Sequence, residues 1–186
     1  MIGYALCGSF CTFAKSVAVL EELKMTYPDI LPIMSFNAYD TDTRFGRCEE
    51  WIEKIEKICG RKIIHTITGA EPLGPKISLD ALIISPCTGN TLAKLANGIT
   101  DSAVTMAAKA HLRADRPLLF ALASNDALSQ NLVNVAKLLN RKSVYFVPMK
   151  QDDPINKPHS LVADLDLLPE TLNNALSGKQ TRKLFL

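Results

Sequence analysis

The residues best suited to chemistry lie in one polar stretch near the middle of the chain, Pro86-Cys87-Thr88-Gly89-Asn90-Thr91. Its threonine hydroxyls and its asparagine amide can hydrogen-bond the edge of a ligand. Gly89 lacks a side chain, so the backbone there can approach a flat ring closely. The stretch therefore indicates a ligand site. An ordinary strand-to-helix turn, with Thr91 as the helix cap, explains the same residues about equally well.

The flanking residues predict the elements that must hold this stretch in place. The apolar run over 81–84 is typical of a buried parallel strand. Because proline has no amide hydrogen, we expect that strand to end at Ser85-Pro86. Apolar residues within 92–96 recur with helical spacing, and Asn97-Gly98 is a helix stop. Ligands of α/β proteins bind at such a place, beyond a strand and next to a helix N-terminus.

Polar residues also follow three other predicted strands. Gly8, Ser9 and Phe10 follow an apolar run over 2–7, Ser35 and Asn37 follow one over 30–34, and Ser124 and Asn125 follow one over 118–122. The Ser9 hydroxyl could bind a single phosphate at a helix N-terminus, or it could cap that helix instead. No G-x-G-x-x-G pattern is present in this turn, so the pyrophosphate of a dinucleotide is disfavoured there.

Strands and helices alternate along the whole chain, which predicts a doubly wound α/β fold. We expect a six-stranded parallel sheet in the order 3-2-1-4-5-6, with a third strand over 63–67 and helices on both faces. This order would place the ends of the first and fourth strands side by side at the switch point. One domain would span residues 1–178, and residues 179–186 would form a mobile tail.

Two isolated side chains invite a chemical interpretation. Arg44 is the only cation of the loop over 40–46 and could bind a phosphate or a carboxylate, although pairing with Asp40 or Asp42 is slightly favoured. His65 could act as a general base, but a strand-end histidine without chemistry is the favoured interpretation. The sequence assigns no catalytic residue.

Composition excludes several classes of protein. The net charge of +2 comes without a basic cluster, so nothing indicates nucleic-acid binding. The apolar runs are too short to cross a membrane. The five cysteines have no C-x-x-C spacing, which disfavours a disulfide framework or a metal site and favours reduced thiols in a cytosol.

The central stretch, followed by Ala96-Asn97-Gly98-Ile99, resembles the P-A-S-A-N-T and A-N-G-I signatures of the homo-oligomeric flavin-containing cysteine decarboxylase superfamily. Gly8-Ser9-Phe10 is similar to the first flavin loop of that superfamily, and Ser35 to its second. The stretch over 123–128 stands where the decarboxylases have P-x-M-N-x-x-M, and only the asparagine matches clearly. Their substrate clamp is therefore not carried over to this chain.

Four further stretches resemble the dipicolinate synthase B subunits of endospore-forming bacteria, a family within that superfamily. This resemblance covers nearly the whole chain. The stretches are Thr43-Arg44-Phe45-Gly46, the residues over 70–76, the residues over 124–128, and Gln151-Asp152-Asp153-Pro154 with Lys157-Pro158.

The resemblance implies a flavoprotein subunit that takes part in the oxidation of dihydrodipicolinate to dipicolinate in the cytoplasm of a sporulating mother cell. It implies a partner, the dipicolinate synthase A subunit, which brings the nicotinamide site, and a homo-oligomer, a trimer or a multiple of one. It implies FMN as the cofactor, contacted by Gly8, Ser9, Phe10, Ser35, Asn37, Pro86, Cys87, Thr88, Gly89, Asn90, Thr91, Ser124 and Asn125.

Two alternatives stay open. The chain could be a non-catalytic subunit that binds flavin or only stabilises a partner. It could also be a flavin-dependent decarboxylase, which the missing P-x-M-N-x-x-M pattern disfavours.

Overall fold

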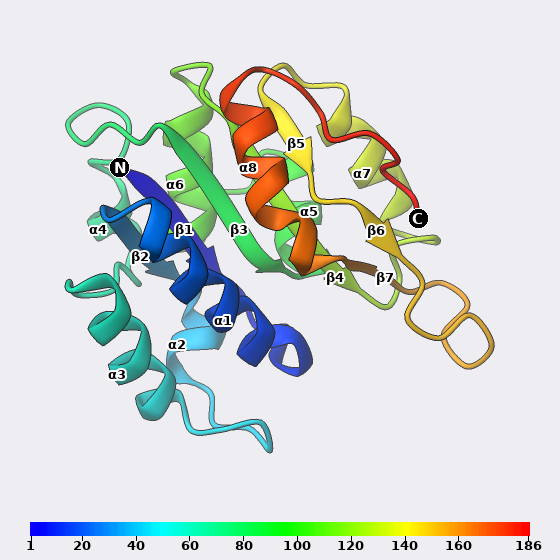
Figure 1. Cartoon of the computed structure of the whole chain (residues 1–186), viewed down its shortest axis with the longest axis horizontal. Helices are drawn as coiled ribbons and strands as arrows, with labels where there is room; N and C mark the ends of the chain where they lie inside the picture. The colour runs from blue at the N-terminus through cyan, green and yellow to red at the C-terminus, as the bar shows by residue number, and fades with distance from the viewer.

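Short runs of buried, mostly aliphatic residues form the strands of one mixed sheet (Figure 1). The computed structural model describes residues 1–186. The strands are β1 (Ile2–Leu6), β2 (Ile30–Met34), β3 (Ala81–Cys87), β4 (Leu118–Ser124), β5 (Val144–Phe146), β6 (Met149–Lys150) and β7 (Leu161–Ala163). The helices are α1 (Phe10–Thr26), α2 (Phe36–Asp40), α3 (Cys48–Cys59), α4 (Ile67–Ala70), α5 (Gly89–Ala96), α6 (Ala103–Leu112), α7 (Leu132–Leu139), the 3-10 helix η1 (Leu165–Leu167) and α8 (Leu168–Leu176).

The four longest strands are parallel and lie in the order β2-β1-β3-β4. Beyond β4, β5 pairs with residues 118–120 in parallel, and β7 pairs with residues 123–124 antiparallel and carries β6 on its other side. The predicted α/β class is confirmed. The predicted six-stranded, all-parallel sheet in the order 3-2-1-4-5-6 is wrong, because the sheet has seven strands and is mixed. Strands as short as β6 and β7 show no period from which to predict them.

The predicted third strand, over 63–67, is reduced to a single bridge between Ile64 and Ile33 of β2. The chain turns into a helix directly afterwards. The Thr66 hydroxyl accepts a hydrogen bond from the Gly69 amide at 3.0 Å and caps α4. This local cap competes with the extended conformation that the apolar residues favour.

The strand before the central stretch is longer than expected. β3 continues through Pro86 to Cys87, with a cis peptide bond between Ser85 and Pro86 and a shift in its register with β4 between Ile84 and Cys87. The Pro86 carbonyl still accepts a hydrogen bond from the Cys7 amide at 3.1 Å. Proline therefore makes β3 irregular at this point but does not end it, and the polar turn begins at Thr88.

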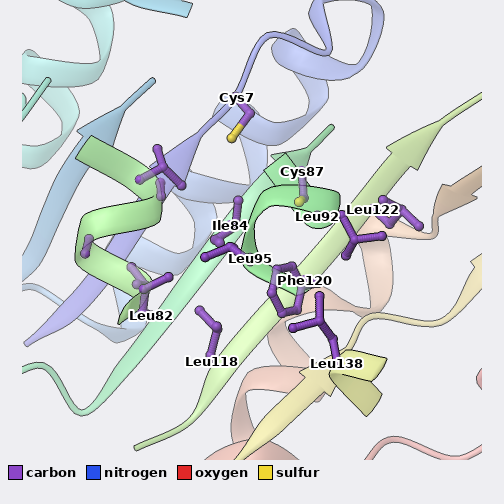
Figure 2. Close-up of a cluster of buried hydrophobic side chains, with 14 of the residues drawn as sticks. Cys7, Leu82, Ile84, Cys87, Leu92, Leu95, Leu118, Phe120, Leu122 and Leu138 are labelled. Atoms are coloured by element: carbon purple, nitrogen blue, oxygen red, sulfur yellow. The ribbon is translucent and has the colours of Figure 1, made fainter. Parts of the chain in front are cut away.

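Alternate residues along the strands face two helix layers and form two apolar clusters. Helices α1, α3 and α8 cover one face of the sheet, and α4, α5, α6 and α7 cover the other (Figure 1). On the second face, Ile84 of β3 and Phe120 of β4 pack with Leu92 and Leu95 of α5 (Figure 2). This packing fixes α5, and with it the turn over 88–91, against the sheet.

The sequence predicts a mobile tail for the last eight residues. In the structure, these residues run beside β5 and β6. The Gln180 side chain bonds both the amide and the carbonyl of Phe146, at 2.9 and 2.7 Å. The Leu184 carbonyl accepts a hydrogen bond from the Met149 amide at 2.7 Å. The chain therefore docks its end on the sheet, while the domain boundary at residue 178 stays a prediction. No helix of the fold has the length and apolar character that crossing a bilayer requires.

Candidate functional site

The ends of β1, β3 and β4 meet at a cavity of about 720 Å³. Several residues predicted from the polar strand ends line it together, which confirms that the fold brings these stretches to one place. The predicted residues in its wall are Gly8, Ser9, Phe10, Arg44, Thr88, Gly89, Asn90, Ser124 and Asn125. The wall also contains residues that the sequence did not single out for the site: Cys11, Thr12, Phe45, Ala123, Asp126, Asp152, Lys157, Ser160 and Val162.

A smaller cavity of about 110 Å³ adjoins the first, and Gly8, Thr88 and Asn90 line both. The small cavity contains the remaining predicted polar residues, Ser35, Asn37 and Thr91, together with Phe36, Lys94 and Ser102. The two cavities therefore gather all four polar strand ends around the N-termini of α1, α2 and α5.

The central turn is built around Thr88. Its hydroxyl accepts a hydrogen bond from the Thr91 amide at 3.2 Å, so Thr88, and not Thr91, caps α5. The Thr88 hydroxyl donates to the Thr91 hydroxyl at 3.1 Å, and Thr91 donates to the Cys7 sulfur at 3.3 Å. The hydroxyls of this turn thus bond mainly to the protein itself, and their positions are fixed.

By contrast, three amide side chains in the cavity walls have no hydrogen-bond partner in the protein. Asn90 lies in the first turn of α5 and faces both cavities, Asn125 follows β4, and Asn37 lies in α2. All three are exposed. They are the side chains of the site that are free to hydrogen-bond a ligand edge.

Ser9 and Ser35 occupy equivalent places but differ in their bonding. The Ser35 hydroxyl caps α2 by accepting from the Ala38 amide at 3.4 Å. The Ser9 hydroxyl makes no capping bond to α1 and instead accepts from Thr12 at 3.2 Å. Because α1 has no acidic residue in its first turn, its N-terminal amides and the Ser9 hydroxyl suit an anion.

Pro86 and Cys87 do not reach either cavity. Both are buried within β3, and Cys87 is 0% exposed among Leu92 and Leu122 (Figure 2). Burial raises the pKa of the Cys87 thiol well above its usual value, and it raises that of Cys7 to about 11. These thiols are therefore neutral at ordinary pH, and both lie in the buried apolar cluster and line neither cavity.

The structure gives a different reason for a glycine at position 89 from the one that the sequence suggested. A side chain there would meet the protein before it met a ligand. A Cβ atom on Gly89 would lie 2.7 Å from Asn131 Nδ2 and 2.9 Å from Asp126 Oδ1, and would also collide with the Ser124 hydroxyl. The glycine lets α5 begin directly against the residues that follow β4.

Asp126 is the centre of that contact. Its carboxylate accepts hydrogen bonds from the Ser124 hydroxyl and from Asn131 Nδ2. Partial burial pushes its pKa upward, but the hydrogen bonds from Ser124 and Asn131 outweigh this and leave the pKa of Asp126 below its usual range. The sequence signal was available, because Asp126 directly follows Ser124 and Asn125.

Two basic side chains line the large cavity. Arg44 is exposed, has no carboxylate partner, and lies with its guanidinium 4.9 Å from the centre of the Phe45 ring. The alternative pairing with Asp40 or Asp42 is absent from the structure. Lys157 pairs with Asp152 at 2.8 Å. His65 lies outside both cavities, stacked on Tyr39 at 3.8 Å between ring centres, and no group of three metal-ligating side chains is present.

Comparison with known proteins agrees with this architecture. A family model described as Flavoprotein matches residues 1–166. The dipicolinate synthase B subunit of Bacillus subtilis strain 168 is 45% identical over 185 residues, which are 100% of this chain and 92% of that protein. The crystal structure of the dipicolinate synthase B subunit from Bacillus halodurans has a TM-score of 0.89 at 41% identity, covering 100% of this chain and 95% of that one.

A more distant structure shares the fold alone. The FMN-dependent cysteine decarboxylase SpaF is 23% identical, with a TM-score of 0.71 over 95% of this chain and 94% of that one. The two dipicolinate synthase proteins reported above match this chain over its full length. The chain belongs to the Flavoprotein family, among its dipicolinate synthase B subunits.

Proposed function

We propose that this chain is the FMN-binding subunit of a dipicolinate synthase and takes part in oxidising dihydrodipicolinate to dipicolinate in a sporulating mother cell. The observation that carries the proposal is the cavity of about 720 Å³ where the ends of β1, β3 and β4 meet. The names of the relatives supply the reaction and the FMN dependence of SpaF supplies the cofactor, both as analogies.

The residues present fit FMN. The phosphate would bind at the N-terminus of α1, where the Ser9 hydroxyl makes no capping bond, with Ser35 and Asn37 in the adjoining small cavity. The edge of the ring would bond to the unpartnered amides of Asn90 and Asn125 and to the Thr88 backbone turn. Bound FMN supplies an acceptor for the two electrons that leave the substrate.

The chain itself would bind and orient the substrate. Aromatisation removes two electrons and two protons from the dihydropyridine ring, and both carboxylates of the substrate remain. Arg44 has no carboxylate partner in the protein and is the natural contact for one substrate carboxylate, since a guanidinium can bind a carboxylate through two parallel hydrogen bonds. We assign no general base.

We further propose a division of labour between two different chains. The turn after β1 contains Gly8 but no G-x-G-x-x-G pattern, so it offers no cradle for the two phosphates of NAD or NADP. A partner chain, the dipicolinate synthase A subunit, would bring the nicotinamide site. We also propose that this chain assembles as a homo-oligomer, a trimer or a multiple of one, with an interface above about 1,000 Å² in total.

The test combines binding and turnover. The isolated chain should develop flavin absorption bands after FMN is added and should show no heat of binding with NADP in calorimetry. Dipicolinate should form only when the partner chain is also present. Micromolar NADP binding, or full turnover by this chain alone, would refute the division of labour. A chain that binds no FMN but is still required for turnover by its partner would instead be a stabilising subunit.

A further inference from the structure

We propose that Lys157 is the residue that selects a dicarboxylate ligand, by exchanging its partner Asp152 for a second ligand carboxylate. The inference rests on the proposed function and deepens it. Arg44 would hold one carboxylate and Lys157 the other, so that a planar ring with carboxylates on both sides of its nitrogen is held at both ends.

The two cations reach the same cavity from different parts of the chain. Arg44 lies in the loop between α2 and α3, and Lys157 lies in the loop between β6 and β7. Both loops project beyond the carboxyl ends of the parallel strands (Figure 1). A ligand in the cavity therefore has one basic side chain from each loop within its walls.

The two acidic residues of the cavity wall, Asp126 and Asp152, differ in whether their carboxylates bind one of these cations. Both carboxylate oxygens of Asp126 already accept hydrogen bonds from Asn131. Asp152 is the carboxylate that holds Lys157, at 2.8 Å between Nζ and Oδ2. That pair is open to water, with side chains 54% and 34% exposed for Lys157 and Asp152 respectively. Water screens such a pair, so a ligand carboxylate can displace Asp152 at small cost.

The main chain beneath Lys157 is nevertheless well held. The Asn156 amide donates to Asp153 Oδ1 at 3.0 Å, and the Lys157 amide donates to the Asp153 carbonyl at 2.8 Å. The Ser160 amide donates to the Lys157 carbonyl at 3.0 Å. Only the flexible side chain of Lys157 needs to move for the exchange, and its backbone stays at the cavity wall.

The experiment measures binding of two probes, dipicolinate and the monocarboxylate picolinate, to the full-length FMN-loaded chain by calorimetry in metal-free buffer. We expect Lys157→Gln to weaken dipicolinate binding about tenfold, as loss of one charged contact does, and to change picolinate binding less than about twofold. Asp152→Asn should strengthen dipicolinate binding, because it removes the competitor. A merely structural role of the pair would weaken binding in both variants.

The matched control is Lys15→Gln. Lys15 pairs with Asp166 at 3.0 Å, is 53% exposed and lies outside the cavity, so its loss should leave both affinities unchanged. Equal effects of Lys157→Gln on the two probes would overturn the inference while FMN and dipicolinate binding by the wild type uphold the proposed function. A wild type that binds FMN but not dipicolinate overturns the inference and the proposed substrate together. A wild type without FMN affinity overturns the proposed cofactor.

Discussion

Asn131 donates its side-chain amide to both carboxylate oxygens of Asp126, at 2.9 Å each. Asn131 is buried, and its own carbonyl accepts from Asn134 at 3.0 Å. The pair therefore ties the turn after β4 to the start of α7, and Gly89 at the start of α5 packs directly against it. Asp126 and Gly89 both line the cavity, so this packing contact lies in its wall.

Gly89→Ala should destabilise the protein by about 1–3 kcal/mol, the usual cost of overpacking. The new Cβ would lie 2.7 Å from Asn131 Nδ2, so either α5 or the asparagine must shift. Urea denaturation followed by circular dichroism measures the change. The neighbouring substitution Asn90→Ala is the control, because Asn90 is exposed and its side chain bonds to nothing in the protein. Equal stability of wild type and Gly89→Ala would show that the contact is loose.

Asp126 should also give the protein a specific dependence on pH. Its hydrogen bonds hold its folded-state pKa below the ordinary value near 3.9. Asp126 therefore contributes stability that is complete above about pH 5 and is lost as the pH falls through the lowered folded-state pKa. We expect the difference in unfolding free energy between wild type and Asp126→Asn to be largest at pH 7 and to shrink at pH 3.

The remaining carboxylates are the same in both proteins and cancel in this difference. A gap that is equal at pH 7 and pH 3 would mean that the charge of Asp126 has no part in the contact.

Segments with a clear pattern of apolar and polar residues could be predicted from the sequence. β1, β2 and β4 are apolar runs with polar ends, and α3 stops at Gly60, which adopts a φ of 70°. The prediction of a strand over 63–67 was wrong. The Thr66 hydroxyl caps α4 there, and this local hydrogen bond outweighs the preference of the surrounding apolar residues for an extended strand. The sequence does not reveal such competition between a local hydrogen bond and sheet pairing.

The prediction of the site had the same limit as the prediction of the fold. The polar ends of parallel strands could be predicted to converge, and the cavity contains most of them. Lys157 and Asp152 could not be placed from spacing, because the antiparallel strands β6 and β7 that carry their loop to the cavity are only two and three residues long. Cys87 lies next to Thr88, yet it is the last residue of β3 and its side chain is buried in the core, whereas Thr88 caps α5 and lines the cavity.

Asn90→Ala should weaken FMN binding roughly tenfold or more, because a ring edge held by this amide would lose a hydrogen bond worth about 1–3 kcal/mol. His65→Ala is the matched comparison, since His65 is exposed, lies outside both cavities and contacts Tyr39 instead. Fluorescence titration with FMN measures both affinities. Equal affinities for the two variants would indicate that the turn after β3 is structural only.

The cysteines provide a test of the cavity that needs no substitution. All five thiols are free, but Cys7, Cys59 and Cys87 are buried, whereas Cys11 is exposed in the cavity wall. Burial raises the pKa of Cys59 to about 11, as it does that of Cys7, so these thiols are poor nucleophiles. We expect iodoacetamide to label Cys11 fastest in the native protein, as read by peptide mass spectrometry.

Cys48 is the internal control. It is partly exposed, lies outside the cavity, and a hydrogen bond with Asp42 raises the pKa of its thiol, so it should react more slowly than Cys11. Saturating FMN should slow the labelling of Cys11 and leave the rate at Cys48 unchanged, because only Cys11 shares its cavity with the proposed cofactor. Protection of both cysteines would point to a change in the whole fold. Protection of neither, in a protein that has bound FMN, would place the flavin outside the large cavity.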